Sequence, residues 1–263
     1  MPLDVTPHDA SMIADAAARL ASGMAVMLLA TSWREVPLRF LRTHCVVILG
    51  LLVLAALDDS RAGGTRAGVS LLGAGAFLAY VGATAWGLGL PRVAIPATWL
   101  LAGAAAAWLA MASGGGGPAA LALAAAGRYA SGFVLGATLT AMLLGHHYLT
   151  APAMSIEPLK RYVKAMGWGL LARGLVGVAA MALAHRGVLP SPAAAGHLGP
   201  PLLLLMRWGM GFAAPALATA LAWKTAQIRS TQSATGILYV AMTLLLVGEL
   251  TAMIAARAGA AVG

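Results

Sequence analysis

The sequence has few charged residues and only one cysteine. Charged residues make up 10% of the 263-residue chain, whereas about a quarter of the residues are charged in a typical soluble domain. Because so few charges cannot cover a large apolar surface in water, the composition excludes a soluble globular fold. The single cysteine, Cys45, excludes an internal disulfide and any iron–sulfur or metal site built from several cysteines.

Acidic residues and catalytic motifs are also scarce. The chain has eight Asp and Glu residues, and the adjacent pair Asp58 and Asp59 has no second acidic cluster with which to form a magnesium–diphosphate site. The His-Glu-x-x-His, Gly-x-Ser-x-Gly and P-loop motifs are missing. We therefore expect no metal site and no catalytic activity of the chain on its own.

Long apolar segments fill most of the chain. Hydrophobic residues make up 60% of it, and the mean hydropathy is +0.85. A helix crosses a bilayer with about 20 apolar residues. Eight windows of that kind occur, at 12–33, 38–57, 67–91, 93–112, 128–150, 165–185, 198–223 and 234–256. The sequence thus predicts an all-α, polytopic transmembrane bundle of about eight spans with short loops, forming a single domain over 1–263. An Ala-rich segment at 119–127 is expected to extend the fifth helix or to form an interfacial helix.

Basic residues stand mostly at the ends of these windows, which indicates anchoring in a membrane and no role in binding nucleic acid. The net charge is +9. If the spans alternate, nine basic residues lie on one side: Arg34, Arg39, Arg42, Arg92, Lys160, Arg161, Lys164, Lys224 and Arg229. The positive-inside rule places that side in the cytoplasm and both termini outside, in a cell membrane of the bacterial inner-membrane type. Acidic residues precede the first window, so we expect it to be kept as a span and not cleaved as a signal peptide.

A short pattern recurs near the outer ends of three odd-numbered windows. Arg19-Leu-Ala-Ser-Gly23 resembles Arg128-Tyr-Ala-Ser-Gly132 and, more loosely, Arg207-Trp-Gly-Met-Gly211. One interpretation of this pattern is a set of duplicated helical hairpins around 19–57, 128–185 and 207–257. The alternative is coincidence in a chain so rich in Ala and Gly.

Four charged residues lie inside predicted spans, where each is a candidate functional residue: Arg128, Arg173, Arg207 and Glu249. Glu249 is expected to pair with Arg207 in preference to Arg128, while Arg173 has no evident acidic partner. Asp15 and Arg19, spaced i,i+4, are expected to pair on one helix face. These charges either pin helices together or form a binding site for a polar head group, a quinone or a proton path.

A second polar cluster is predicted at the cytoplasmic face. It combines His146 and His147 with Lys224, Arg229, Ser230 and Gln232. His147 is preferred over His146 as a cofactor-binding residue, because the small residues Gly136 and Thr140 share its helical face. Together with His44, one of these histidines would make a bis-His haem b site geometrically feasible. The alternative is that all three are ordinary interfacial side chains.

Three functions remain open from the sequence. The first is an integral subunit of a larger membrane complex that handles electrons, quinone or haem with other membrane subunits. The second is a transporter or channel for a small solute or ion. The third is a lipid-modifying enzyme embedded in the membrane.

Overall fold

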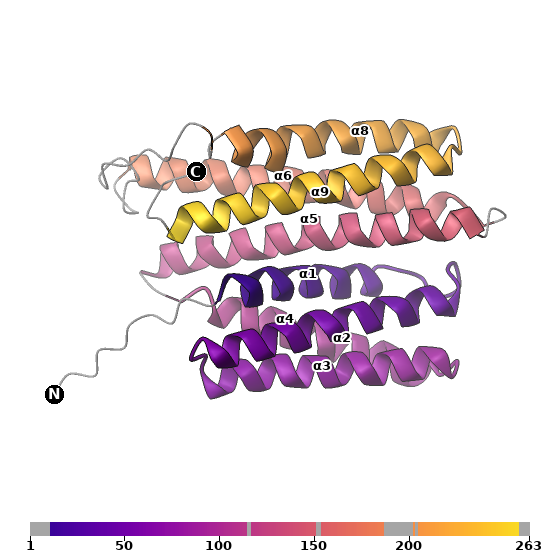
Figure 1. The fold of residues 1–263 in the computed structure, drawn as a ribbon, viewed down its shortest axis with the longest axis horizontal. Coiled ribbons are helices and arrows are strands. Elements are labelled where there is room, and N and C mark those ends of the chain that lie inside the picture. The colour runs from indigo at the N-terminus through magenta and orange to yellow at the C-terminus, as the bar shows by residue number, and fades with distance from the viewer. Residues whose placement is uncertain (1–10, 115–116, 151–153, 187–201, 203–204, 258–263) are drawn as a thin grey trace. The chain divides into compact units, whose positions relative to one another are not determined.

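The computed structural model describes residues 11–114, 117–150, 154–186, 202 and 205–257, and these residues form helices without any strand. The elements are α1 (Met12–Leu29), α2 (Leu38–Arg61), α3 (Arg66–Gly87), α4 (Pro91–Met111), α5 (Pro118–Thr150), α6 (Glu157–His185), the π-helix η2 (Met206–Ala213), α8 (Ala214–Gln227) and α9 (Thr231–Arg257). Figure 1 shows the labelled helices α1 to α6, α8 and α9 as long rods. The predicted all-α fold is confirmed.

Seven helices within the described part of the chain are long and apolar enough to cross a membrane. They correspond to the predicted windows one to six and eight. The seventh window holds the π-helix η2, which continues directly into α8, so the chain stays helical there but changes its hydrogen-bond pattern. The Ala-rich segment before Arg128 belongs to α5, which begins at Pro118. The chain is therefore a multi-pass helical membrane protein, because in lipid the backbone groups of each segment must be satisfied within a helix.

Glycine, proline and threonine set the helix ends in the first part of the chain. Gly63 and Gly89 take positive φ values of 82° and 69° just after α2 and α3, a conformation that suits glycine because it lacks a Cβ. Pro91 begins α4, where its missing N–H costs nothing. The Thr65 hydroxyl caps α3 by accepting from the Gly68 amide at 3.1 Å.

The described helices fall into two compact units, unit 1 (Met1–Gly136) and unit 2 (Ala137–Gly263), with the boundary inside α5. In unit 1, α1 packs on α2, α2 on α3, α3 on α4 and α4 back on α1, so the four helices close into a ring. In unit 2, α8 packs against α6 and α9, and η2 packs against α9. Each unit therefore has its own set of helix contacts.

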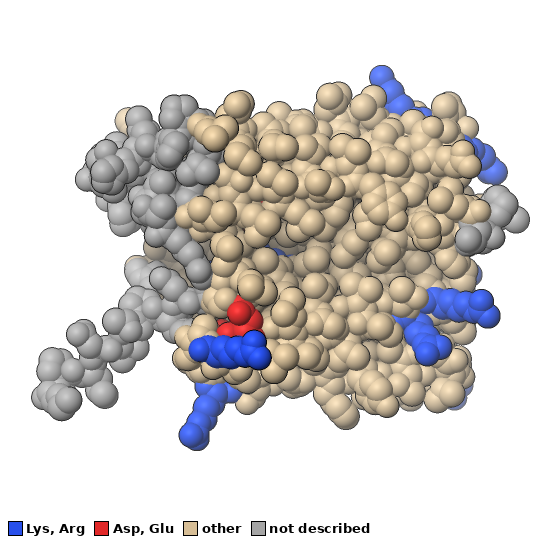
Figure 2. Space-filling view, in the orientation of Figure 1, with Lys and Arg blue, Asp and Glu red and all other residues tan. Residues whose placement is uncertain are grey.

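The surface of the helices matches a bilayer. Large apolar side chains are exposed along them, including Phe77 on α3, Trp99 on α4 and Leu175 on α6. In Figure 2 the Lys and Arg side chains gather at the helix ends, and the broad zone between the ends is almost free of charge. Such an apolar band suits the hydrocarbon core of a membrane.

Candidate functional site

The recurring Arg-x-x-x-Gly pattern marks places where helices touch at the backbone. A Cβ on Gly23 of α1 would overlap the carbonyl oxygen of Gly132 of α5, and one on Gly132 would lie 2.7 Å from the Arg19 carbonyl oxygen. Gly136, one turn further along α5, lies directly against the Gly23 backbone. Two copies of the pattern thus pack on each other in unit 1, as expected for small residues at helix contacts in lipid.

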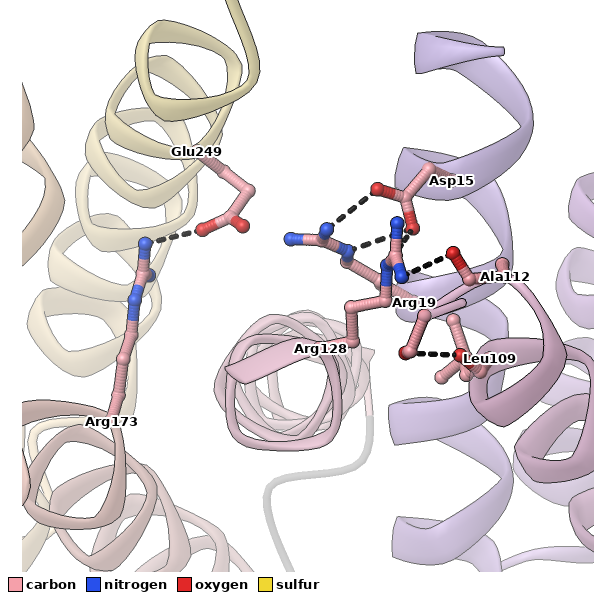
Figure 3. A network of polar contacts seen from close by, with 8 residues as sticks. Asp15, Arg19, Leu109, Ala112, Arg128, Arg173 and Glu249 are labelled. Carbon is pink, nitrogen blue, oxygen red and sulfur yellow. Dashed lines mark hydrogen bonds and ion pairs between the residues drawn. The ribbon is translucent and has the colours of Figure 1, made fainter. Parts of the chain in front are cut away.

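The arginines of these two copies meet on Asp15, a buried residue in the first turn of α1. Arg19 approaches Asp15 at 2.5 Å, as the i,i+4 spacing predicts, and Arg128 of α5 donates from Nε to Oδ1 at 3.2 Å. Arg128 also donates to the Ala112 carbonyl at the end of α4 (Figure 3). The cluster therefore ties α1, α4 and α5 together.

The unit 1 cluster is placed at a helix end. Asp15 stands beside the positive N-terminal end of α1, which favours a carboxylate. The Asp58 carboxylate, on α2, accepts from the backbone amide of Ala14 at 2.9 Å and so caps the same end. These bonds hold α1, α4 and α5 together at one end, along with Asp58 of α2. The role of the cluster is therefore structural.

In unit 2 the buried acid is Glu249 of α9, and it forms an ion pair with Arg173 of α6 (Figure 3). The expectation that Arg173 has no acidic partner was wrong, because assigning depth by counting along separate spans misjudged how α6 and α9 cross. Both side chains are almost fully enclosed, with 6% of Arg173 and 5% of Glu249 exposed. The favoured pairing of Glu249 with Arg207 stays a prediction.

The π-helix η2 forms a third wall beside this pair. A Cβ on Gly211 of η2 would lie 3.0 Å from the Cα of Gly248, the residue before Glu249. The Phe212 ring of η2 packs against Gly174, the residue after Arg173. A Cβ placed on Gly174 would lie 3.0 Å from Cζ of Phe212. The third copy of the Arg-x-x-x-Gly pattern thus packs next to both members of the ion pair.

The irregular geometry of η2 has a cause in the sequence that the hydropathy analysis missed. Pro215 follows η2, has no N–H to donate, and would clash with the carbonyl of Gly211 four residues before it in a regular α-helix. Gly209 and Gly211 add backbone freedom just ahead of it. Short π-helical segments occur often at functional sites, and Gly209, Gly211 and Pro215 together were the available signal.

One nitrogen of the Arg173 guanidinium takes no part in the ion pair with Glu249. Among the described residues, Nη1 of Arg173 is buried and has no hydrogen-bond partner, while Nη2 donates to Glu249. An unsatisfied donor in an apolar interior costs free energy of about 1–3 kcal/mol, and more when it is charged. Arg173, Glu249 and η2 therefore form a buried polar site with one donor free to bind a further group.

The predicted cytoplasmic histidines end α5. His146 is exposed, His147 is half-buried, and Tyr148 beside them is buried. The Tyr148 hydroxyl donates to the Ser155 carbonyl, which fastens the end of α5 to the segment before α6. The structure thus adds Tyr148 as a structural residue, and the cofactor role of His147 stays a prediction.

The remaining cytoplasmic residues lie in or near the turn between α8 and α9. Lys224, Arg229 and Gln232 are exposed, and Ser230 is half-buried. Arg229 has a positive φ of 56°, and the Ser230 amide donates to the Thr225 carbonyl at 3.0 Å, a geometry typical of a helix C-terminus. The polar sequence between α8 and α9, which suggested a binding cluster, thus contains the C-terminal cap of α8.

His44, the third predicted cofactor-binding histidine, is fully buried on α2 in unit 1. Its Nδ1 lies 2.9 Å from the Phe40 carbonyl oxygen, and the His44 and Phe40 rings pack with their planes tilted by 50° and their centroids 4.1 Å apart. Within the described residues, its Nε2 has no hydrogen-bond partner.

The described residues contain no group of three or more His, Cys, Asp and Glu side chains that could hold a metal ion. The chain matches no protein family, no curated protein and no solved structure.

Proposed function

We propose that this protein is a transporter that carries a small anion together with a proton, with Arg173 and Glu249 as the coupling pair. The observation that carries the proposal is the buried Arg173–Glu249 ion pair, in which Nη1 of Arg173 has no partner among the described residues. Ionisable residues inside membrane spans are costly and rare, and they mark ion pathways and proton relays in many membrane proteins.

The chemistry of the pair suggests how proton and anion are coupled. When Glu249 takes up a proton it becomes a neutral carboxylic acid, and Arg173 is left as a buried cation. A buried cation requires a counter-ion, so a small anion then binds the guanidinium through Nη1 and Nη2. Release of the proton restores the ion pair and displaces the anion. One positive and one negative charge move together, so the transport cycle is electroneutral.

The π-helix η2 supports the same proposal. Short π-helical segments are rare and occur frequently at functional sites. Here η2 packs beside both Arg173 and Glu249 through Phe212 and Gly211. A π-helix that converts to a regular helix would shift these contacts and open the site to one side of the membrane.

The test uses purified protein in liposomes that contain a trapped pH-sensitive dye. Potassium salts of chloride, nitrate, phosphate and succinate are added outside in turn, with valinomycin present to clamp the membrane potential. We expect at least one salt to acidify the lumen in wild-type vesicles. Glu249→Gln should abolish the proton signal, and Arg173→Gln should abolish both proton and anion uptake.

The matched control is Glu157→Gln. Glu157 is also paired with a basic residue in unit 2, Lys160 at 3.0 Å, but 64% of its side chain is exposed. This variant should transport as the wild type does. Lumen acidification that persists in Glu249→Gln, or that is equally reduced in Glu157→Gln, would refute the coupling role.

A second candidate function is an integral subunit of an electron-transfer complex. The observation that favours it is the buried imidazole of His44, whose Nε2 has no partner within the described residues and is the type of atom that ligates haem iron. The absorption spectrum of the purified protein tests it. A Soret band that disappears in His44→Ala supports this function. If the protein purified together with its membrane partners shows no Soret band, this function is contradicted.

The proposed topology is a cell-membrane protein with both termini outside. Replacing Cys45, which is buried, by Ala yields a background for single-cysteine labelling. A membrane-impermeant maleimide should label Leu3→Cys and Ala261→Cys from outside intact cells, and should label Ser155→Cys and Ser230→Cys only after the cells are broken. Labelling of either terminus only in broken cells would reverse the orientation.

A further inference from the structure

Unit 1 contains a cavity of about 190 Å³ that the proposed transport function does not use. It lies where α1 and α3 end and α2 and α4 begin, and three of its walls are the indole rings of Trp33, Trp86 and Trp99. Leu41 and Thr98 complete its buried side. It is thus a pocket with flat aromatic walls at one end of the four-helix ring.

The cavity opens toward lipid. Trp99 and Ile95, both on α4, are 62% and 39% exposed, so the wall they form is also part of the apolar outer surface. Two other lining residues, Trp86 and Leu41, are buried. A ligand could therefore enter sideways from the membrane and keep an apolar tail outside in the lipid.

The size and the walls favour a single flat ring. An apolar cavity of about 150 Å³ holds one benzene molecule, so a cavity slightly larger holds one substituted six-membered ring and has no room for the two acyl chains of a phospholipid. Indole rings stack on flat rings with centroids about 4.5–7 Å apart. Three indoles around one small cavity are therefore suited to an aromatic or quinonoid ring.

Two polar groups add chemical selectivity. Thr98 is buried, and its hydroxyl donates to the Ala94 carbonyl at 2.8 Å, so towards a ligand it can act only as an acceptor. An acceptor in an apolar pocket selects a ligand that donates, such as a ring hydroxyl. The Arg34 guanidinium stands 5.2 Å from the centre of the Trp33 ring and so places a positive charge next to this lining residue.

We propose that this cavity binds the ring of a membrane quinol, a hydroxylated six-membered ring on an apolar tail, with one ring hydroxyl donating to Thr98. The ring is enclosed by Trp33, Trp86 and Trp99, and the tail leaves past Ile95 into the lipid. The oxidised quinone, which has carbonyls and no ring hydroxyl, would bind more weakly because it leaves the Thr98 oxygen without a donor.

The experiment measures binding of decylubiquinol and of its oxidised form to the purified full-length protein in detergent, by isothermal titration calorimetry. Wild-type protein should bind the quinol saturably, near one per chain. Trp99→Leu should weaken binding about tenfold, equivalent to about 1.4 kcal/mol, through loss of ring stacking. Trp168→Leu is the matched control, because Trp168 is also an outward-facing tryptophan, 69% exposed, but lies on α6 in unit 2.

Thr98→Val provides an independent arm, since valine has nearly the shape of threonine but no hydroxyl. It should weaken quinol binding and leave binding of the oxidised form unchanged. Size-exclusion profiles and thermal unfolding establish that each variant is folded, and Thr98→Val decides the question if Trp99→Leu does not fold.

Three results would overturn the proposal. The first is no saturable quinol binding, and the second is equal weakening by Trp99→Leu and Trp168→Leu. The third is displacement of the quinol by phosphatidylglycerol but not by phosphatidylcholine, which would identify the pocket as a site for an acidic lipid. None of these results bears on anion uptake, so the transport proposal is tested separately.

Discussion

The two units share the same kinds of residues, but these residues have different roles in each unit. Each has a buried acid bound by arginine, and in each a glycine of the recurring Arg-x-x-x-Gly pattern touches another helix at the backbone. In unit 1 the acid is Asp15, which stands at a helix end and binds two arginines. In unit 2 the acid is Glu249, well inside α9, and its partner Arg173 keeps one nitrogen unsatisfied among the described residues.

The position of a buried charge along its helix separates a structural charge cluster from a candidate functional site. A charge near a helix end has water or headgroups close by and is held there at little cost. A charge deep in an apolar unit is expensive, and an unsatisfied donor makes it more so. Unit 2 adds the π-helix η2 beside its ion pair, whereas the corresponding helices α1 and α5 of unit 1 are regular. The depth of the charges, the incomplete pairing of Arg173 and the neighbouring π-helix together single out unit 2.

The largest expected effect concerns the glycine contacts that the two units share. Gly136→Ala in unit 1 and Gly248→Ala in unit 2 would each force a methyl group into a neighbouring backbone, so we expect each to lower the free energy of unfolding by about 3 kcal/mol or more. Thermal or denaturant unfolding in detergent measures this.

The matched controls are Gly50→Ala and Gly236→Ala, because a Cβ on either glycine meets nothing within 4 Å. These should stabilise the protein by about 0.5–1 kcal/mol, since alanine favours a helix more than glycine does. A destabilised Gly136→Ala with an unaffected Gly248→Ala would show that only unit 1 depends on its glycine contact.

The second effect distinguishes the two ion-pair clusters. Arg173→Gln and Glu249→Gln should each cost about 3–5 kcal/mol of unfolding free energy, and the double variant should cost less than the two added, because it leaves no unpaired charge. Asp15→Asn should cost only about 2 kcal/mol, as Arg19 and Arg128 are partly exposed and still reach water. A strictly additive double variant would mean that Arg173 and Glu249 do not interact.

A smaller effect compares the two arginines that compete for Glu249. Double-mutant cycles of Glu249→Gln with Arg173→Gln and with Arg207→Gln measure the coupling of each pair. We expect the larger coupling for Arg173, whose ion pair with Glu249 is enclosed on all sides. Arg207 is half-buried on η2, so water screens its charge more than that of Arg173 and its coupling should be the smaller of the two. A larger coupling for Arg207 would restore the pairing predicted from the sequence.

The smallest expected effect concerns the histidines that end α5 in unit 2. His146→Ala and His147→Ala should each change the free energy of unfolding by less than about 1 kcal/mol, because neither side chain is buried. If a haem or quinone is bound at this end, His147→Ala should remove its absorption signal and His146→Ala should not. If both variants keep the same absorption signal, His146 and His147 are ordinary interfacial residues.

The candidate site was only partly accessible from the sequence. Arg173 and Glu249 stand out because charges are rare in apolar windows, so both were predicted as candidate residues. Their pairing was not predicted. Two helices approach each other at an angle and a rotation that depend on every contact between them, and a depth count along each window ignores both. The π-helix was missed for a related reason, since hydropathy does not register the hydrogen bonds that Pro215 removes.

The amino-acid sequence was enough to predict a helical, multi-pass membrane protein, and seven of its eight predicted windows are helices long and apolar enough to cross a membrane. That much follows from local properties, because apolar content is a sum over residues and lipid leaves the backbone of each segment no alternative to a helix. The contacts of Gly23 with Gly132 and Gly136, of Asp15 with Arg128 and of Glu249 with Arg173 depend on the folded arrangement of the helices. Those contacts join residues up to 113 positions apart. In a chain with 32 glycines, many helix faces offer the same small surface, so the choice among them rests on how whole helices fit together.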